Sequence, residues 1–187
     1  MKSLLIILSL SVLAFSTEYE LSYEDGVWSA SYALGTPEQQ NLRVRFTPTT
    51  QIVGTHLVKA KVYWHFVSGG SDLSFHFNVF EPDSGFSENS GSFSIQNQTQ
   101  WLVYDISSIN YIASSNDFYL AAVSDDAGHV GVSACNHVPI DLRSAWQTLT
   151  QPNWITITNY DLCLRAIFDD SVAVEPTSLG NIRALYH

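Results

Sequence analysis

Residues 61–80 read KVYWHFVSGGSDLSFHFNVF, and this stretch indicates the fold class. Apolar side chains alternate with polar ones in 62–66, and the alternation resumes in 73–79 after Gly69 and Gly70. A period of two residues is typical of a half-buried β-strand, and a Gly-Gly pair between two such runs predicts a hairpin. The stretch therefore predicts two strands whose apolar face needs a second layer of chain to cover it.

The rest of the chain repeats this pattern. Short strands are predicted at 27–33, 41–46, 92–95, 100–105, 117–124, 132–135, 154–158 and 161–168. Residues 81–91 read as a turn-rich connection, 107–115 as irregular or one helical turn, and 143–150 as a loop or an edge. No segment has the helical period of a βαβ unit. We therefore expect an all-β protein, an antiparallel two-sheet β-sandwich.

The first sixteen residues have the features of a secretory signal peptide. Lys2 is followed by an apolar run over 4–15, and small residues precede Thr17. The run is too short to span a bilayer, and no later stretch could cross one. A retained anchor is the alternative interpretation. Cleavage after Ser16 predicts a secreted protein, extracellular or at the cell surface, with one sandwich domain over 17–168.

The charge of the chain argues against nucleic acid as a partner. The formal net charge is −10, and removing Lys2 with residues 1–16 makes it −11. Such a surface repels phosphate backbones, and no basic patch with interleaved aromatic residues is visible. A solvated acidic surface explains the charge, and affinity for divalent cations is the alternative.

The chain has two cysteines, Cys135 and Cys163. In an oxidising compartment they could form one disulfide. Two buried thiols are the alternative, since free cysteine behaves as a small apolar residue. A nucleophile pair of Cys135 with His137 is a third interpretation, for which a Cys-x-His spacing alone is weak evidence.

The C-terminal part differs from the strands. Residues 169–175 read as a linker, and 176–187 read as a short amphipathic segment with Leu179, Ile182 and Leu185 on one face. A helix of two turns is marginal alone in water, so the segment must dock on something. Packing against its own sandwich and docking on a partner or the cell surface are both open.

Several short motifs in chain order carry a resemblance to a known family. They are 23–26 (YEDG), 43–48 (RVRFTP), 61–66, 101–106 (WLVYDI), 117–120 (DFYL), 143–144, Trp146 or Trp154, and 161–166 (DLCLRA). Together they resemble the jelly-roll accessory domains of exported bacterial peptidases, including immune-inhibitor-like metallopeptidases. The resemblance spans 23–166 and implies a non-catalytic sandwich with jelly-roll topology, sometimes with a structural Ca²⁺. Glu24 stands where the family usually has Asp, and Cys163 where it often has Met or another apolar residue.

The acids at family-like positions are the calcium candidates: Glu24, Asp25, Asp117 and Asp161. Carboxylates at turns and strand ends supply the oxygen ligands that Ca²⁺ prefers. Each could instead shape a turn by accepting hydrogen bonds from backbone N–H groups. Both interpretations stay open for these four residues.

The predicted hairpin also predicts a ligand-binding surface. If Val67 pairs with Asp72, then Tyr63 lies opposite His76, and His65 and Asn78 share the same face. An aromatic ring with polar hydrogen-bonding groups on one sheet is suited to holding a sugar. The alternatives are an ordinary solvent-facing sheet or one covered by a loop. Two imidazoles could also bind a transition metal, but no third ligand is visible.

Catalytic signatures are missing from the sequence: it has no His-Glu-x-x-His, no Gly-x-Ser-x-Gly and no phosphate-binding glycine loop. We therefore expect a protein that is not an enzyme but a secreted binding module for carbohydrate or another extracellular polymer. The alternative is a structural subunit that assembles with copies of itself through edge strands and the terminal segment. A hydrolase is the third and weakest interpretation.

Overall fold

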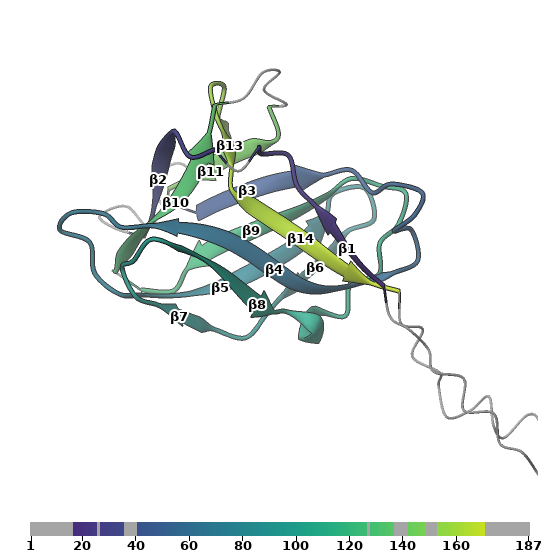
Figure 1. The fold of residues 1–187 in the computed structure, drawn as a ribbon. Coiled ribbons are helices and arrows are strands. Elements are labelled where there is room, and N and C mark those ends of the chain that lie inside the picture. The colour runs from purple at the N-terminus through teal and green to yellow at the C-terminus, as the bar shows by residue number, and fades with distance from the viewer. Residues whose placement is uncertain are drawn as a thin grey trace, which may run out of the picture.

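The structure is a computed structural model that describes residues 17–25, 27–35, 41–126, 128–136, 142–148 and 153–170. The predicted signal peptide (1–16) and nearly all of the predicted linker and terminal segment lie outside the described residues. Within them, all strand pairs are antiparallel and form two sheets packed face to face (Figure 1). The strands extend from Glu18 to Asp169.

We call the two layers sheet A and sheet B. The strands of sheet A are β1 (Glu18–Leu21), β2 (Ala30–Gly35), β4 (His56–His65), β8 (Gln100–Asp105), β10 (His129–Cys135), β13 (Asp161–Leu162) and β14 (Leu164–Asp169). The strands of sheet B are β3 (Asn41–Phe46), β5 (Leu73–Glu81), β6 (Phe86–Asn89), β7 (Phe93–Ile95), β9 (Phe118–Ser124), β11 (Ser144–Gln147) and β12 (Ile155–Thr156).

The chain crosses repeatedly from one sheet to the other. It runs from β2 in sheet A to β3 in sheet B, back to β4 and then to β5, and it alternates again from β8 through β11. This alternation between facing layers is the jelly-roll arrangement that the sequence predicts. The predicted all-β two-sheet sandwich is confirmed.

The core lies between the sheets and is rich in aromatic rings. Its largest fully buried side chains include Trp64 from sheet A and Phe46, Phe75, Phe77 and Phe118 from sheet B. β5 shows why the pattern folds this way, because its residues are buried at every second position from Leu73 to Glu81. Burying one such aromatic side chain contributes on the order of 2 kcal/mol.

The predicted hairpin between 61–66 and 73–80 is wrong. β4 belongs to sheet A, where it pairs with β8, β14 and β10, while β5 belongs to sheet B, where it pairs with β9, β6 and β7. The apolar faces of β4 and β5 point at each other across the core instead of lying side by side. The alternation identifies both as strands, but it cannot tell whether two successive strands pair or stack.

Two further segments differ from expectation. Residues 81–91 contain strand β6, and 143–150 contain β11, which lies between β3 and β12. Residues 107–115 hold the 3-10 turn η1 (Ser107–Ile109), as the sequence predicts. In the described ranges, no helix is long and apolar enough to cross a membrane.

Candidate functional site

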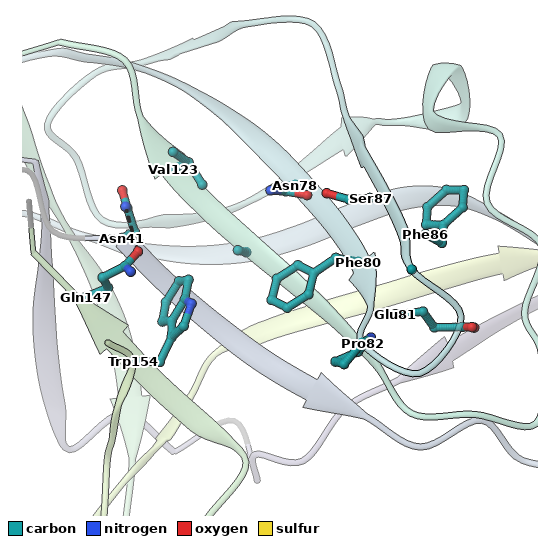
Figure 2. A pocket seen from close by; sticks show the side chains of 12 residues that line it. Asn41, Asn78, Phe80, Glu81, Pro82, Phe86, Ser87, Val123, Gln147 and Trp154 are labelled. Carbon is teal, nitrogen blue, oxygen red and sulfur yellow. Dashed lines mark hydrogen bonds between the residues drawn. The ribbon is translucent and has the colours of Figure 1, made fainter. Parts of the chain in front are cut away.

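The outer face of sheet B carries an open groove of about 490 Å³. Figure 2 shows side chains from the strands of this sheet and from the loops beside them converging on it. The lining residues are Asn41, Asn78, Phe80, Glu81, Pro82, Gly85, Phe86, Ser87, Ala121, Val123, Gln147 and Trp154. This volume falls within the range of small-molecule sites, and aromatic rings with a few amides are typical linings of such sites.

The register of β5 and β9 creates the floor of the groove. Asn78 and Phe80 point outward from β5 because Phe77 and Val79, which alternate with them, are buried and face the core. Asn78 lies opposite Ala121 of β9, whose methyl group is too small to fill the space beside the amide. The Oδ1 atom of Asn78 is buried and has no hydrogen-bond partner. Asn78 lines the groove, and its amide oxygen still has the capacity to accept a hydrogen bond.

Two more amides line the groove where β3 meets β11. Asn41 is the register partner of Gln147, and its Nδ2 atom donates to Gln147 Oε1 at 3.4 Å. The Oδ1 atom of Asn41 accepts from the backbone N–H of Ser124 at 3.4 Å. Together with Asn78, these side chains supply both donors and acceptors along one side of the groove.

An arginine holds the aromatic wall together. The guanidinium of Arg43 lies 4.2 Å from the ring centroid of Tyr119 and 4.3 Å from that of Trp154, and the ring of Tyr119 stacks on Phe80 at 4.8 Å. Arg43 does not line the groove itself, whereas Trp154 and Phe80 do. The cation therefore fixes Trp154 from one side and leaves another part of the indole at the groove.

Arg43 also lines a second, smaller pocket of about 100 Å³. Its other walls are Arg45, Tyr119, Leu142, Arg143, Ser144, Ala145 and Thr156. The Nε atom of Arg43 is buried without a hydrogen-bond partner, and that of Arg45 is buried 3.5 Å from the carboxylate of Asp117. Burial lowers the pKa of Arg43, the nearby Tyr119 raises it, and the neighbouring charge of Arg45 lowers it further. Guanidinium groups in this arrangement suit a carboxylate or another oxyanion.

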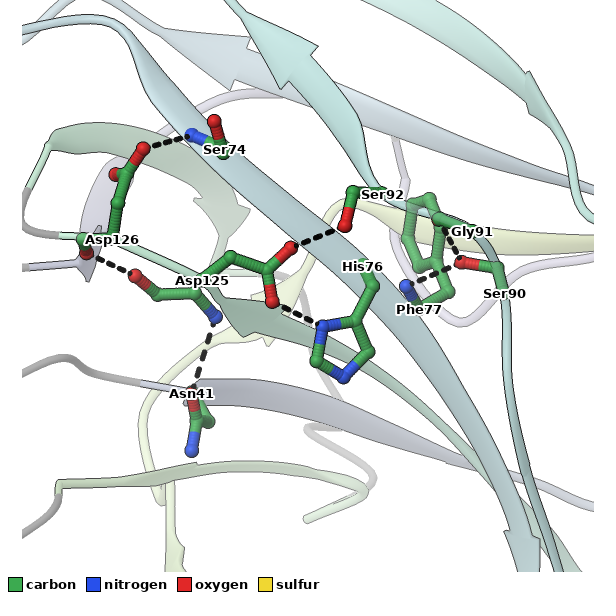
Figure 3. Close-up of polar contacts among 10 residues, drawn as sticks. Asn41, Ser74, His76, Phe77, Ser90, Gly91, Ser92, Asp125 and Asp126 are labelled. Atoms are coloured by element: carbon green, nitrogen blue, oxygen red, sulfur yellow. Dashed lines mark hydrogen bonds and ion pairs between the residues drawn. The ribbon is translucent and has the colours of Figure 1, made fainter.

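A polar network extends the same face beyond the groove (Figure 3). Nδ1 of His76 lies 2.6 Å from Oδ1 of Asp125, and the hydroxyl of Ser92 donates to Oδ2 of Asp125 at 2.9 Å. Asp126 fixes the loop that carries Asp125, because its carboxylate accepts from the backbone N–H groups of Ser74 and Gly128. Hydrogen bonds from the Gly128 and Ser74 amides hold the pKa of Asp126 below its ordinary value, against the effect of burial.

The structure divides the four predicted ligand-binding residues between two faces. Asn78 lines the groove, and His76 lies two residues away on the same face of β5. Tyr63 and His65 belong to β4 in the other sheet, where Tyr63 stacks on Trp101 at 5.2 Å and His65 on Trp28 at 4.5 Å. The predicted single surface is wrong because β4 and β5 do not pair.

The four calcium candidates do not converge on one point. Asp117 accepts from Thr47 Oγ1 at 2.7 Å and lies 3.5 Å from Arg45. Asp25 accepts from the backbone N–H of Val27 at 2.8 Å, which is a turn-forming role. Glu24 pairs with Arg165, and Asp161 is buried on β13 next to β10. A Ca²⁺ ion shared by all four carboxylates does not fit this arrangement.

The two cysteines lie close together in the core. Cys135 and Cys163 are both fully buried thiols and are not joined by a disulfide. Their sulfur atoms and a carboxylate oxygen of Glu24 lie within 4.8 Å of one another. Among the alternatives left open by the sequence, buried thiols are therefore the state that the structure has.

Several residues of the groove are not predictable from the sequence. Trp154, Asn41, Gln147 and Arg43 come from segments far apart in the chain, and only the fold brings them to one face. The alternation in 41–46 does place Arg43 and Arg45 on the side of β3 opposite the core. It carries no information about which aromatic rings would cover them.

Comparison with known proteins does not assign the chain to a family. No family model and no curated protein matches it. Among solved structures, it is similar to a family two carbohydrate esterase from Cellvibrio japonicus, with a TM-score of 0.29 and 10% sequence identity. The similarity covers 80% of this chain and 36% of that chain, so this chain spans about a third of that protein. Function must therefore be argued from the site.

Proposed function

We propose that this protein is a secreted, non-catalytic binding module that holds carbohydrate or a related extracellular polymer in the groove of sheet B. The observation that carries the proposal is the pairing of an aromatic wall, Trp154 and Phe80, with the unsatisfied amide oxygen of Asn78 in one open groove. The resemblance to accessory domains of exported peptidases points to the same kind of role and stays a prediction.

The chemistry of the groove matches that of a sugar. One face of a pyranose ring is lined by C–H groups and packs on an indole or phenyl ring, which Trp154 and Phe80 provide. Its hydroxyl groups both donate and accept, and the amides of Asn41, Asn78 and Gln147 do the same. An open groove also allows a long polymer to enter and leave at its ends, which a closed cavity would not.

The arginines favour an acidic polymer over a neutral one. The chain has only 8 Lys and Arg against 18 Asp and Glu, yet three of those cations line the pocket next to the groove. Trp154 joins the two sites, since it borders the groove and covers Arg43. A sugar bound against Trp154 could place a carboxylate or sulfate group near Arg43, whose buried Nε atom has no hydrogen-bond acceptor.

We infer a binding role without catalysis from the His76 network. A serine nucleophile of the Ser-His-Asp type needs its hydroxyl hydrogen-bonded to an imidazole that acts as the base. Among the described residues, the hydroxyl of Ser92 donates to Asp125, not to the imidazole of His76. The network therefore supports a role in fixing the end of the groove.

Affinity electrophoresis and titration calorimetry with a polygalacturonate and a neutral β-glucan test the proposal. We expect Trp154→Ala and Asn78→Ala each to weaken polysaccharide binding by about tenfold or more, as expected for a central contact. Tyr63→Ala, which removes an aromatic ring from the opposite sheet, should leave binding unchanged. Equal losses in all three variants, or no binding of either polymer by the folded protein, would contradict the proposal.

Self-assembly is the alternative function, and the exposed apolar side chains Val27, Trp28 and Val103 of the sheet A side favour it. Sedimentation velocity over a range of protein concentrations distinguishes the two. Polymers that form without polysaccharide and disappear in Trp28→Ser would support assembly. A single species whose sedimentation changes only when polysaccharide is added supports the binding module.

A further inference from the structure

Three metal-ligating side chains meet in the core on the side of the sandwich away from the groove. They are Glu24, Cys135 and Cys163, whose ligand atoms lie within 4.8 Å of one another. Cys135 ends β10, and Cys163 joins β13 to β14, where its backbone N–H donates to Ser133 of β10 at 2.8 Å. The pairing of these two strands holds the two sulfur atoms side by side.

Glu24 is the unusual member of this group. Its side chain has no exposed surface, and its Oε1 atom accepts a hydrogen bond from Nε of Arg165. Its other oxygen, Oε2, is buried and has no hydrogen-bond partner. Leaving a buried carboxylate oxygen unsatisfied is unfavourable, so the atom has an unused capacity to bind a donor or a cation.

We propose that Glu24, Cys135 and Cys163 form a binding site for Zn²⁺. Two thiolates and one carboxylate oxygen are ligands that Zn²⁺ accepts, and three protein ligands leave a fourth position for water. Tetrahedral Zn²⁺ with bonds of about 2.3 Å to sulfur requires ligand atoms roughly 3.8 Å apart, so a small contraction of the cluster suffices. Soft sulfur ligands disfavour Ca²⁺ and Mg²⁺ at the same place.

The charges around the cluster balance with the metal bound. The charge of Glu24 is already neutralised by Arg165, which also pairs with Glu20, and Glu20 pairs in turn with Lys61. Two thiolates would neutralise the two charges of Zn²⁺. Binding of Zn²⁺ would therefore add no net charge to the site. An uncompensated buried charge would be unfavourable. The hydrogen bond from Arg165 to Oε1 would also orient the carboxylate so that Oε2 faces the metal.

Zn²⁺ must displace protons to bind. Burial raises the pKa of Cys135 to about 11, with the charges of Asp25 and Glu24 adding to the effect. Burial and the charge of Glu24 also raise the pKa of Cys163 well above its ordinary value. Cysteine binds Zn²⁺ as the thiolate, so ligation by the two cysteines displaces their thiol protons.

A disulfide between the two cysteines is the competing outcome. A disulfide would consume both sulfur atoms but would leave Glu24 Oε2 without a partner, whereas a metal ion bound by the two sulfur atoms would also be a partner for that oxygen. The two outcomes differ in mass and in thiol content, so one preparation distinguishes them.

The test uses the full mature chain, prepared under reducing conditions and freed of metal with a chelator. We expect calorimetry with ZnCl₂ to give one ion per chain. Co²⁺ should give the charge-transfer absorption of sulfur ligation. CaCl₂ should give neither binding heat nor a change in melting temperature.

Variants separate the site from general effects on folding. Cys135→Ser, Cys163→Ser and Glu24→Gln should each weaken Zn²⁺ binding by at least about tenfold, because each removes one ligand. Asp117→Asn, an acid on the other sheet, is the matched control and should bind Zn²⁺ normally. If a cysteine variant fails to fold, the Co²⁺ spectrum of the unaltered chain still decides. Folded protein with two reduced thiols but no sulfur-to-cobalt absorption would overturn the proposal, and so would isolation of the exported protein as a disulfide.

Discussion

Trp64 of sheet A and Phe75 of sheet B meet edge to face across the core, with ring centroids 5.1 Å apart. The two residues are close in sequence, but they lie in strands that stack instead of pairing. The ring of Tyr104 completes the cluster, 5.3 Å from Phe75 and 6.2 Å from Trp64. This contact joins the two layers near the turn that connects β4 to β5.

Truncation of Trp64 should therefore destabilise the whole sandwich. Trp64 has no exposed surface, and Trp64→Ala should lower the free energy of unfolding by about 3–5 kcal/mol because it leaves a large cavity. Phe66→Ala is the control, since Phe66 continues the same alternation but is 54% exposed, and it should cost no more than about 0.5 kcal/mol. Urea unfolding measures both. Similar losses in the two variants would contradict the burial of Trp64 between the two sheets.

A buried carboxylate should make stability depend on pH in the acid range. Glu81 is 4% exposed, and its Oε1 atom accepts from Tyr111 Oη at 2.7 Å and from Ser114 Oγ at 2.6 Å. Burial would raise the pKa of Glu81, but the hydrogen bonds from Ser114 and Tyr111 outweigh it and hold the pKa below its ordinary value. A lowered pKa in the folded state gives stability that is present above the unfolded pKa of 4.5 and is lost as the pH falls through the folded value.

Glu81→Gln tests this effect, because the amide oxygen can still accept from both hydroxyl groups. We expect a loss of about 1 kcal/mol at neutral pH, where bonds to a charged acceptor become bonds to a neutral one. The loss should shrink as the pH falls below the unfolded pKa. Urea unfolding at a series of pH values gives the comparison, with the exposed Glu88→Gln as control. A variant whose pH dependence matches that of the unaltered protein would rule out this role for Glu81.

Gly35 marks a close approach of two backbones at the end of β2. Its φ is +100°, and a Cβ atom there would lie 1.9 Å from the carbonyl oxygen of Gly128. Gly54 has a similar φ of +89°, but a Cβ atom added to it would meet nothing within 4 Å. Gly54→Ala should cost about 1 kcal/mol from backbone strain alone, and Gly35→Ala roughly 3 kcal/mol from strain plus overpacking. Thermal and urea unfolding measure the loss of stability in both variants. Equal losses for Gly35→Ala and Gly54→Ala would contradict the close contact between β2 and the turn before β10.

The smaller pocket, which Arg43, Arg45 and Arg143 line, predicts how salt should affect the binding of an acidic polysaccharide. If Arg43 contacts an acidic group of the polymer, Arg43→Gln should weaken polygalacturonate binding by about tenfold and reduce its dependence on salt. Binding of a neutral glucan should change little. Lys59→Gln on sheet A removes the same charge far from the groove and is the control. Titrations at several salt concentrations measure this. If Arg43→Gln and Lys59→Gln behaved alike, an acidic ligand at Arg43 would be excluded, whereas polysaccharide binding in the groove would not.

Local periodicity is enough to specify the fold class of this protein. Alternation in 41–46 and 73–80 requires extended chain with one apolar face, since a period of two residues cannot bury the same side chains in a helix. Most strands, including β7, β8 and β9, can be predicted within a few residues in this way. β6 and β11 cannot, because β6 is largely exposed and β11 is short.

Strand pairing, and therefore which side chains share a surface, is settled by packing across the whole chain. It depends on contacts between residues far apart in sequence, and local periodicity is the same whether two strands pair or stack. The sequence thus predicts Tyr63 and His65 on the face of His76 and Asn78, although they lie on the opposite sheet. The meeting of Trp154 with Arg43, and of Glu24 with Cys135 and Cys163, likewise follows from packing over long sequence separations.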